Sequence, residues 1–473
     1  MAVASVVVVG TIMSILDTTI VNVALRTLGR DFNSPLATIQ WVATGYMLSL
    51  ATVIPLTGWA SERFGARRVW MTSVILFMLG SALSGAAWSA GSLIFFRVLQ
   101  GFGGGMIMPV GMAILAQAAG PQRMGRVMGI VGVPMLMGPI LGPVLGGLLV
   151  EYVSWRWIFF VNLPIGAIGL AMAVRLLPRS RPQPGKLDVR GFLLLSPGIG
   201  GVVYGLAEIA SKGGIESALP AIALFGGLVL VVAFVFHALR TEKPLLDVRL
   251  FKNVRFSAAS ATTFLLAGAL FGGMILMPLY FQQVRGEGAL AAGLLMAPQG
   301  VGAAAVMPLA GWLTDKLSPG RVVIPGLVCV LIGTLPFTQL GTHTSYVLLS
   351  AAMVLRGVGI GATMMPAMSA AYQTLDHAAV PRATSSLNVL QRVGGSLGTA
   401  ILAVVLQHRI TALQPNISHA YGETFWVAMA MSAVAIVPAL RLLPKPEAAE
   451  TMPEEELPMG PGALTEVPET LAS

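Results

Sequence analysis

The segment GWASERFGARRV, residues 58–69, returns in the second half of the chain as GWLTDKLSPGRV, residues 311–322. A glycine, a tryptophan, an acid, a base and a final arginine recur at the same offsets. A second pair follows the same plan, because RVLQGFGGGMIMP at residues 97–109 echoes VLRGVGIGATMMP at residues 354–366. Such repeats predict two related halves that pack around a pseudo-twofold axis, an arrangement that suits a transporter with a site between the halves.

Composition places both halves in a membrane. Hydrophobic residues make up 55% of the 473 residues, charged residues only 10%, and the mean hydropathy is +0.81. Only helices and closed barrels satisfy their backbone polar groups in lipid, and continuous apolar runs of roughly 20 residues favour helices. We therefore expect an all-α integral membrane protein with fourteen spans. The spans lie near residues 4–26, 40–60, 69–89, 93–117, 127–150, 157–177, 191–210, 219–239, 257–281, 289–313, 322–341, 345–371, 387–407 and 424–443.

Lysine and arginine indicate the side on which each loop lies. If the N-terminus is cytoplasmic, most of the 29 Lys and Arg residues fall in cytoplasmic loops, as the positive-inside rule requires. This orientation puts both termini in the cytoplasm, and we expect the plasma membrane as the location. Sidedness and attraction to anionic lipid headgroups explain the net charge of +9, so the charge gives no reason to expect a nucleic acid partner.

Two basic loops, residues 175–190 and 238–256, divide the spans into a 6+2+6 arrangement. The last stretch of the chain is rich in Pro and Glu and has too little apolar content to pack, which predicts disorder. The expected domains are an N-terminal six-helix bundle (1–180), a two-helix insert with basic cytoplasmic flanks (181–250), a C-terminal six-helix bundle (251–443) and a disordered tail (444–473).

Several functional classes lack their signatures. No G-x-x-x-x-G-K-[ST] loop is present, so the sequence does not predict ATP binding of the P-loop type. The single Cys329 allows neither an intrachain disulfide nor a cysteine metal cluster, and the five His residues are scattered singly. No nucleophile–base pair is visible. We expect neither an enzyme nor a protein with a metal or cofactor, which leaves an ion gradient as the energy source.

Charged residues inside the spans indicate where such an ion acts. Asp17, in SILDTTIVNVAL, lies in the middle of the first span, and Arg97, in the fourth span, can lie at the same depth. The pair is either a proton switch or a static ion pair that joins two helices. Intramembrane acids favour the switch, because a carboxylate in lipid is too costly to keep without a function. Arg356 and Arg392 have no acid within a span to match them: Arg356 either contacts substrate or neutralises a helix end, and the role of Arg392 stays open.

Five motifs occur in a fixed order: LDTTIVNVAL, IPLTGWASERFGARR, FFRVLQGFGGGMIMP, GPILGPVLGG and SWRWIFFVNLPIG. Together they resemble the signature set of the fourteen-span drug/proton antiporters of the major facilitator superfamily, the EmrB/QacA type of multidrug efflux transporter. The similarity extends over nearly the whole chain, to about Leu443. It implies a fold of two six-helix bundles with two extra helices, energy from the proton gradient, and export of amphipathic compounds.

The resemblance implies roles for individual residues. Asp17 becomes the proton-linked acid, and Arg97, Gln100 and Gly101 belong to the fourth-helix motif. The loop motif, expected to latch the cytoplasmic ends of the helices, comprises Gly58, Glu62, Arg63, Gly65 and Arg67, with its repeat at Gly311, Asp315, Lys316 and Arg321. The sequence departs from the family at three positions: Glu62 replaces an aspartate, Ala66 an arginine, and Arg26 the proline that commonly ends the first-helix motif. The first two predict a looser or longer-reaching latch.

The fifth span carries LMGPILGPVLGGLLV, residues 136–150, in a region without charge between Arg126 and Glu151. Its prolines bend the helix, and its glycines form a small face for close packing. The resemblance makes this the antiporter motif, a seam that resists proton leak where the two bundles would meet. Its residues are Gly138, Gly142, Pro143, Gly146 and Gly147.

The substrate is less legible. The 25 methionines could offer a soft surface to varied apolar ligands, although ordinary membrane packing explains most of them. The candidate cavity residues are Tyr46, Met106, Met108, Met274, Met277, Gln282, Gln283, Arg356, Met364 and Met365. Three functions stay open. The first is a proton-coupled exporter of amphipathic drugs that works as a monomer among lipids, the second a dedicated exporter of an endogenous lipid, antibiotic or siderophore, and the third a non-transporting receptor or scaffold.

Overall fold

The computed structural model consists of helices and connecting segments throughout the part of the chain that it describes. The described residues are 2–119, 123–179, 182, 185–212, 214–215, 217–373, 375, 379–414 and 416–443. One compact unit ends at Leu443. The predicted disordered tail, 444–473, lies outside the described residues.

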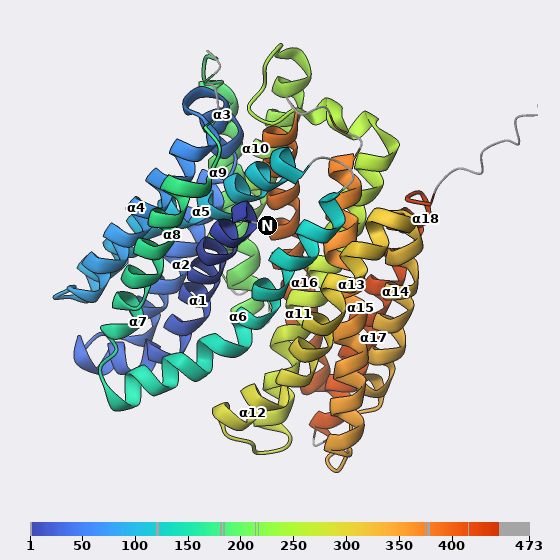
Figure 1. The fold of residues 1–473 in the computed structure, drawn as a ribbon. Coiled ribbons are helices and arrows are strands. Elements are labelled where there is room, and N and C mark those ends of the chain that lie inside the picture. Colours follow the sequence, from blue (N-terminus) through green and yellow to red (C-terminus); the bar gives the residue numbers. More distant parts are fainter. Residues whose placement is uncertain are drawn as a thin grey trace, which may run out of the picture. The chain divides into compact units, whose positions relative to one another are not determined.

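The helices follow the predicted 6+2+6 order (Figure 1). The N-terminal bundle contains α1 (Ala2–Asp31), α2 (Leu36–Val53), α3 (Leu56–Phe64), α4 (Ala66–Gly85), α5 (Ala90–Ala119), α6 (Met124–Tyr152), α7 (Trp157–Phe160) and α8 (Asn162–Leu176). The insert contains α9 (Val189–Lys212) and α10 (Ala218–Arg240). The C-terminal bundle, introduced by the 3-10 helix η2 (Val248–Lys252), contains α11 (Val254–Gln283), α12 (Ala289–Leu295), α13 (Ala297–Leu317), α14 (Pro319–Thr334), η3 (Leu335–Gln339), α15 (Tyr346–Gln373), α16 (Val380–Ala412), α17 (Ile417–Val434) and α18 (Ile436–Leu440).

Among the described residues, twelve helices are long and apolar enough to cross a membrane, and the bent pair α2–α3 makes a thirteenth. The pair bends by 58° at Pro55, which lacks the backbone N–H that would continue the α2 hydrogen-bond ladder. Helix α6, 29 residues long, occupies the position of the fifth predicted span. Short helices such as α7 and α12 each complete a span with the helix that follows, and breaks of this kind explain why the number of helices exceeds the number of predicted spans.

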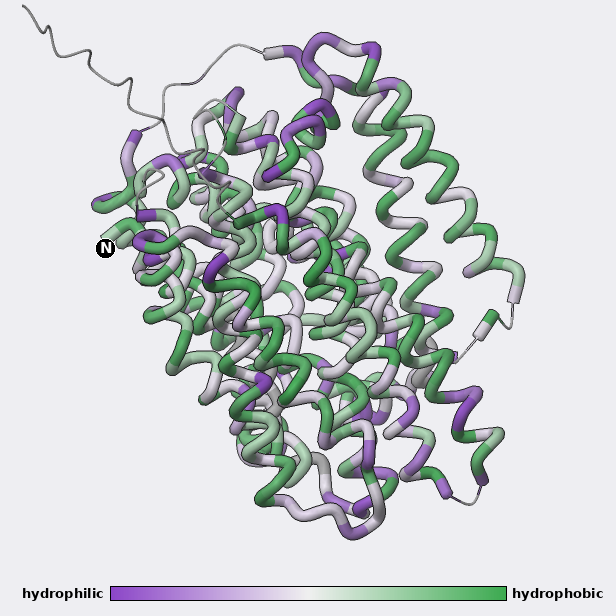
Figure 2. Tube along the Cα trace, turned by 90° about the vertical axis from the view of Figure 1, so that its right-hand side faces the viewer, coloured by the Kyte–Doolittle hydropathy of each residue, from purple (hydrophilic) through white to green (hydrophobic). Residues whose placement is uncertain are grey.

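Hydrophobic residues cover the lengths of the helices, whereas hydrophilic residues gather toward the two ends of the molecule (Figure 2). Side chains such as Val229, Phe236 and Ile75 are exposed on this apolar belt, as expected for a surface that contacts lipid. We name the ends by elements: the α3 end, at the top of Figure 1, and the α12 end, at the bottom.

The insert differs from a simple appendage. Helix α9 packs against α10, and it also contacts α2 of the first bundle and α16 of the second. At the α3 end, Asp188 joins the two ends of the insert by accepting hydrogen bonds from Gly191 N (2.9 Å) and Leu245 N (3.2 Å) and by pairing with His237 Nε2 (2.8 Å). Burial raises the pKa of Asp188, but these hydrogen bonds outweigh it and hold the pKa below its ordinary value.

Candidate functional site

A buried ion pair lies in the interior of the N-terminal bundle. Asp17 of α1 is 0% exposed and Arg97 of α5 is 1% exposed, and Arg97 Nη1 lies 2.6 Å from Asp17 Oδ2. The sequence analysis placed both residues at one depth, and the structure brings them into direct contact. A buried ion pair is stable only when further hydrogen bonds satisfy the remaining polar atoms, so the neighbours of this pair decide its properties.

Two amide side chains complete the carboxylate's surroundings. Gln100 Nε2 donates to Asp17 Oδ1 at 2.8 Å, and its Oε1 accepts from Arg97 Nη1 at 2.7 Å. Asn162, the first residue of α8, donates from Nδ2 to the same Oδ1 at 3.1 Å. The sequence analysis assigned Gln100 to this motif but missed Asn162, although Asn162 lies in the quoted segment SWRWIFFVNLPIG. Four helices therefore contribute to or contact one carboxylate cluster, which we call the Asp17 cluster.

Helix α2 closes the arginine side of the Asp17 cluster. Arg97 Cζ lies 4.0 Å from the ring centroid of Tyr46, and Arg97 Nε donates to Val42 O at 3.2 Å. Gly101 allows this approach, because a Cβ there would come within 2.6 Å of Tyr46 O. Tyr46, a candidate substrate contact from the sequence, is thus fully buried against the guanidinium by a cation–π contact.

The C-terminal bundle buries an arginine without an acid. Arg356 of α15 is 2% exposed; its Nη1 donates to Gln299 Oε1 (3.2 Å) and its Nη2 to Ala269 O (3.4 Å). No carboxylate among the described residues pairs with it. Arg392 of α16, partly buried, has no hydrogen-bond or ion-pair partner in the described part of the chain, but it lies within electrostatic range of Tyr46 across the bundle interface.

The first loop motif joins the two bundles at the α3 end. Glu62 of α3 accepts two hydrogen bonds from Arg382 of α16, from Nε at 2.9 Å and from Nη2 at 2.8 Å. One turn earlier, the hydroxyls of Thr57 and Ser385 lie 2.6 Å apart. Gly58 lets α3 approach, since a Cβ there would lie 3.2 Å from Arg382 Cα. Arg382 was not predicted, and nothing in its local sequence indicates a partner on a helix so far away in the chain.

The second loop motif makes the pseudo-symmetric contact. Asp315 of α13 accepts hydrogen bonds from the backbone N–H groups of Gly125 (2.7 Å) and Arg126 (3.1 Å) at the start of α6. Gly311 packs directly on Gly125. Each loop motif thus binds the opposite bundle. Among the described residues, every side-chain hydrogen bond between the two bundles lies at the α3 end, so this conformation is closed there.

The other motif residues have local roles. Gly65 adopts φ 86° where α3 turns into α4, and Arg67 Nη2 donates to Val174 O at 2.6 Å. Lys316 Nζ lies 4.0 Å from the ring centroid of Trp312. Arg63 and Arg321 are exposed.

The sequence from residue 7 to residue 399 matches the sequence model of the Major Facilitator Superfamily. The chain belongs to this superfamily. The multidrug resistance protein B homolog of Mycobacterium tuberculosis (strain ATCC 25618 / H37Rv) is 40% identical over 488 residues, an alignment that covers 94% of this chain and 90% of that protein.

Solved structures confirm the facilitator fold. The proton:xylose symporter XylE bound to 6-bromo-6-deoxy-D-glucose superposes with a TM-score of 0.65 at 15% identity, over 94% of this chain and 95% of that one. The human organic anion transporter MFSD10 superposes with a TM-score of 0.63 at 17% identity, over 93% of this chain and 99% of that one. This facilitator is therefore a multi-pass membrane transporter of small molecules and not an enzyme.

The antiporter motif of this facilitator packs differently from the prediction. A Cβ on Gly146 would come within 2.8 Å of Ile20 Cγ1, and Gly138 and Gly142 face Ile15 and Thr19 of α1 in the same way. The glycine face thus lies against α1 in its own bundle, beside Asp17, rather than where the two bundles meet. The expectation of an interbundle seam was wrong in this conformation, because the i, i+4, i+8 stripe faces α1. Gly147 has open space around it, and the Pro143 side chain lies outside the described part.

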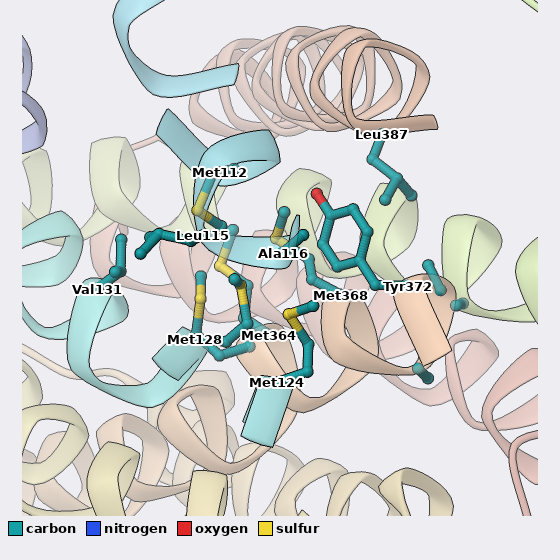
Figure 3. Close-up of a cluster of buried hydrophobic side chains, with 14 of the residues drawn as sticks. Met112, Leu115, Ala116, Met124, Met128, Val131, Met364, Met368, Tyr372 and Leu387 are labelled. Atoms are coloured by element: carbon teal, nitrogen blue, oxygen red, sulfur yellow. The ribbon is translucent and has the colours of Figure 1, made fainter. Parts of the chain in front are cut away.

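Methionines gather between the bundles of this facilitator, in a buried hydrophobic cluster (Figure 3). The cluster includes Met112, Met124 and Met128 from the first bundle and Met307, Met364, Met365 and Met368 from the second.

The remaining candidate cavity residues lie in several environments. Met108 and Met274 are partly buried and pack on the methionine cluster, Met106 packs in the first bundle, and Met277 is buried near the α12 end of the second. Gln282 and Gln283 are exposed at the end of α11, where Gln283 Oε1 accepts a hydrogen bond from Tyr421 at 2.8 Å.

Proposed function

We propose that this facilitator is a proton-coupled antiporter that exports amphipathic small molecules across the plasma membrane, with both termini in the cytoplasm. The observation that carries the proposal is the Asp17 cluster. It holds one titratable acid in the interior of a bundle, away from solvent, with a fixed cation as its partner. The proton gradient supplies the energy, and no further cofactor is needed.

The cluster links protonation to helix position. When Asp17 binds a proton, the carboxylate loses its charge, and Arg97 is left as a buried cation without a counter-ion. Leaving one member of a buried pair uncompensated costs about 3–5 kcal/mol, so the bundle gains by moving Arg97 toward water or another acceptor. Because Arg97 also contacts Tyr46 and Val42 O, such a movement displaces α2 relative to α5.

Helices α2 and α3 connect the cluster to the contact with the second bundle. Tyr46 lies on α2, and Glu62, which binds Arg382, lies on α3 directly after the bend. A shift of α2 therefore acts on the contacts that close the α3 end. In the proposed orientation this end is cytoplasmic, which accounts for the concentration of Lys and Arg in its loops. The conformation described is then the one closed to the cytoplasm.

The methionine cluster supports an amphipathic substrate. It fills the space between the bundles while the α3 end is closed, and it becomes accessible from the cytoplasm when that end opens. Methionine side chains adapt their shape to different apolar ligands. The relative from Mycobacterium tuberculosis is named a multidrug resistance protein homolog, which agrees with varied apolar substrates.

Transport in proteoliposomes with an imposed pH gradient tests the proposal, with a panel of fluorescent amphiphiles of differing charge. The variant Asp17→Asn keeps an oxygen that accepts from Gln100 and Asn162 but no longer exchanges a proton. We expect it to lose gradient-driven transport while gradient-independent exchange of labelled for unlabelled substrate continues.

Asp31→Asn is the matched control, because Asp31 lies at the end of the same helix and its bond to Trp155 Nε1 (2.6 Å) survives the change. Full gradient-driven transport by Asp17→Asn would overturn the assignment of the proton site. Transport powered by ATP in the absence of any gradient would overturn the energy source.

A further inference from the structure

A cavity of about 310 Å³ opens at the α3 end of the N-terminal bundle, apart from the Asp17 cluster. Gly65, Arg67, Arg68 and Arg179 line it. The first three belong to the turn between α3 and α4, and Arg179 follows α8. Three guanidinium groups therefore meet around one space, although the segments that carry them are far apart in the sequence.

The cavity has no acid in its lining. Arg67 uses Nη2 to bind Val174 O, and its remaining donors stay available. Arg68 and Arg179 are exposed and have no hydrogen-bond or ion-pair partner among the residues that the structure describes. The nearest acid in the sequence, Glu62, is already bound to Arg382. Like charges gathered in this way repel each other, and an anion placed between them relieves the repulsion.

The backbone adds to the positive field. Gly65 is the residue before α4, and its positive φ turns the chain so that the 20-residue helix begins beside the arginines. No side chain caps this helix and no acid occupies its first turn, so its first N–H groups stay available to an anion.

Apolar side chains beside the arginines indicate where the anion comes from. Phe64, next to Gly65, is 49% exposed, and Val174, whose carbonyl binds Arg67, is 53% exposed. Both belong to membrane-spanning helices at the point where these leave the bilayer. Cations at the level of the headgroups, with exposed apolar surface next to them, match a molecule that has an anionic phosphate and an acyl chain.

We propose that the cavity formed by Arg67, Arg68, Arg179 and the Gly65 turn binds a phosphate ester anion, supplied by the headgroup of an anionic phospholipid. Arginine binds phosphate oxygens in bidentate geometry, and three arginines exceed what a single phosphodiester charge requires. The volume is at the lower limit for small-molecule pockets, which suits a headgroup better than a whole transported drug.

Native mass spectrometry of the full chain, released from nanodiscs of stated composition, tests the proposal. Phosphatidylglycerol is the anionic probe, and phosphatidylcholine has the same phosphodiester without net charge. The variant Arg68→Gln/Arg179→Gln removes two guanidinium groups and leaves the Arg67–Val174 contact intact. Arg240→Gln/Arg255→Gln is the matched control, because it removes two exposed arginines at the same end but outside the cavity.

We expect the wild type to retain phosphatidylglycerol in preference to phosphatidylcholine. The cavity variant should retain it roughly tenfold more weakly, and the control should match the wild type. Equal losses in the two variants, or equal retention of the two lipids, would overturn the site. Glycerol 1-phosphate at millimolar concentration is the soluble probe. If it binds the wild type but not the cavity variant while phosphatidylglycerol shows no preference, the phosphate site stands and its lipid source is wrong.

Discussion

The two bundles bury an arginine on corresponding helices but treat its charge differently. When VLQG at residues 98–101 is aligned with VLRG at 354–357, Arg356 takes the position of Gln100. In the first bundle Gln100 binds a carboxylate on α1, whereas in the second Arg356 binds the carbonyl of Ala269 on α11. The repeat has preserved the contact between the helices while replacing the acid with a backbone oxygen.

The difference separates a titratable bundle from one with a fixed charge. Protonation can change the charge of the Asp17 cluster, but nothing around Arg356 in the described part of the chain can respond in this way. Coupling between proton and conformation therefore belongs to the first bundle. The second bundle contributes a static positive charge, and Arg392 adds another on the face of α16 toward Tyr46.

The largest expected effect comes from removing each arginine in turn. Arg97→Met leaves the Asp17 carboxylate buried without its counter-ion, and we expect a loss of about 3–5 kcal/mol in the free energy of unfolding. Arg356→Met removes a buried cation that has no acid, so the stability should stay unchanged or rise by about 1 kcal/mol. Thermal unfolding of the purified variants in detergent compares the two.

The double variant Asp17→Asn/Arg97→Met is the control, because it removes both charges and should recover part of the loss. An Arg356→Met variant destabilised as much as Arg97→Met would show that the two arginines are equivalent, and the contrast between the bundles would fail.

Much of this organisation could be predicted from the sequence, because it depends on composition and local pattern. Hydropathy indicated the helices, and the depth of Asp17 and Arg97 within their spans indicated their pairing. Asn162, Arg382 and Gln299 were missed, since each finds its partner through packing between helices that are distant in the chain. The direction of the glycine face on α6 was also beyond the sequence. A stripe of small residues predicts a close neighbour without identifying it, and here the neighbour is α1.

Glycine substitutions sharpen the comparison at the helix contacts. A Cβ on Gly80 would come within 2.6 Å of Gln100 Cα, and the backbone there cannot move aside. A Cβ on Gly273 would meet the end of the Arg356 side chain, which is flexible. We expect Gly80→Ala to cost about 1–3 kcal/mol and Gly273→Ala less than about 1 kcal/mol, both measured by thermal unfolding. Arg356→Met should remove the cost of Gly273→Ala, and a cost that persists in that background would assign it to helix contact rather than to the arginine.

The two loop motifs supply the smallest effects. Asp315 binds two backbone N–H groups, and an asparagine there can accept from only one of them, whereas the Glu62–Arg382 pair has both side chains 21% exposed and is screened by solvent. With Cys329 replaced by serine, a Ser385→Cys probe at the α3 end reports opening through its rate of labelling by a charged maleimide. We expect Asp315→Asn to raise this rate about tenfold and Glu62→Gln about threefold, because a charge-assisted bond to a buried donor outweighs a partly solvated ion pair. Equal rates in the two variants would mean that the bundles are held by their apolar contact, with the methionine cluster rather than the loop motifs keeping the α3 end closed.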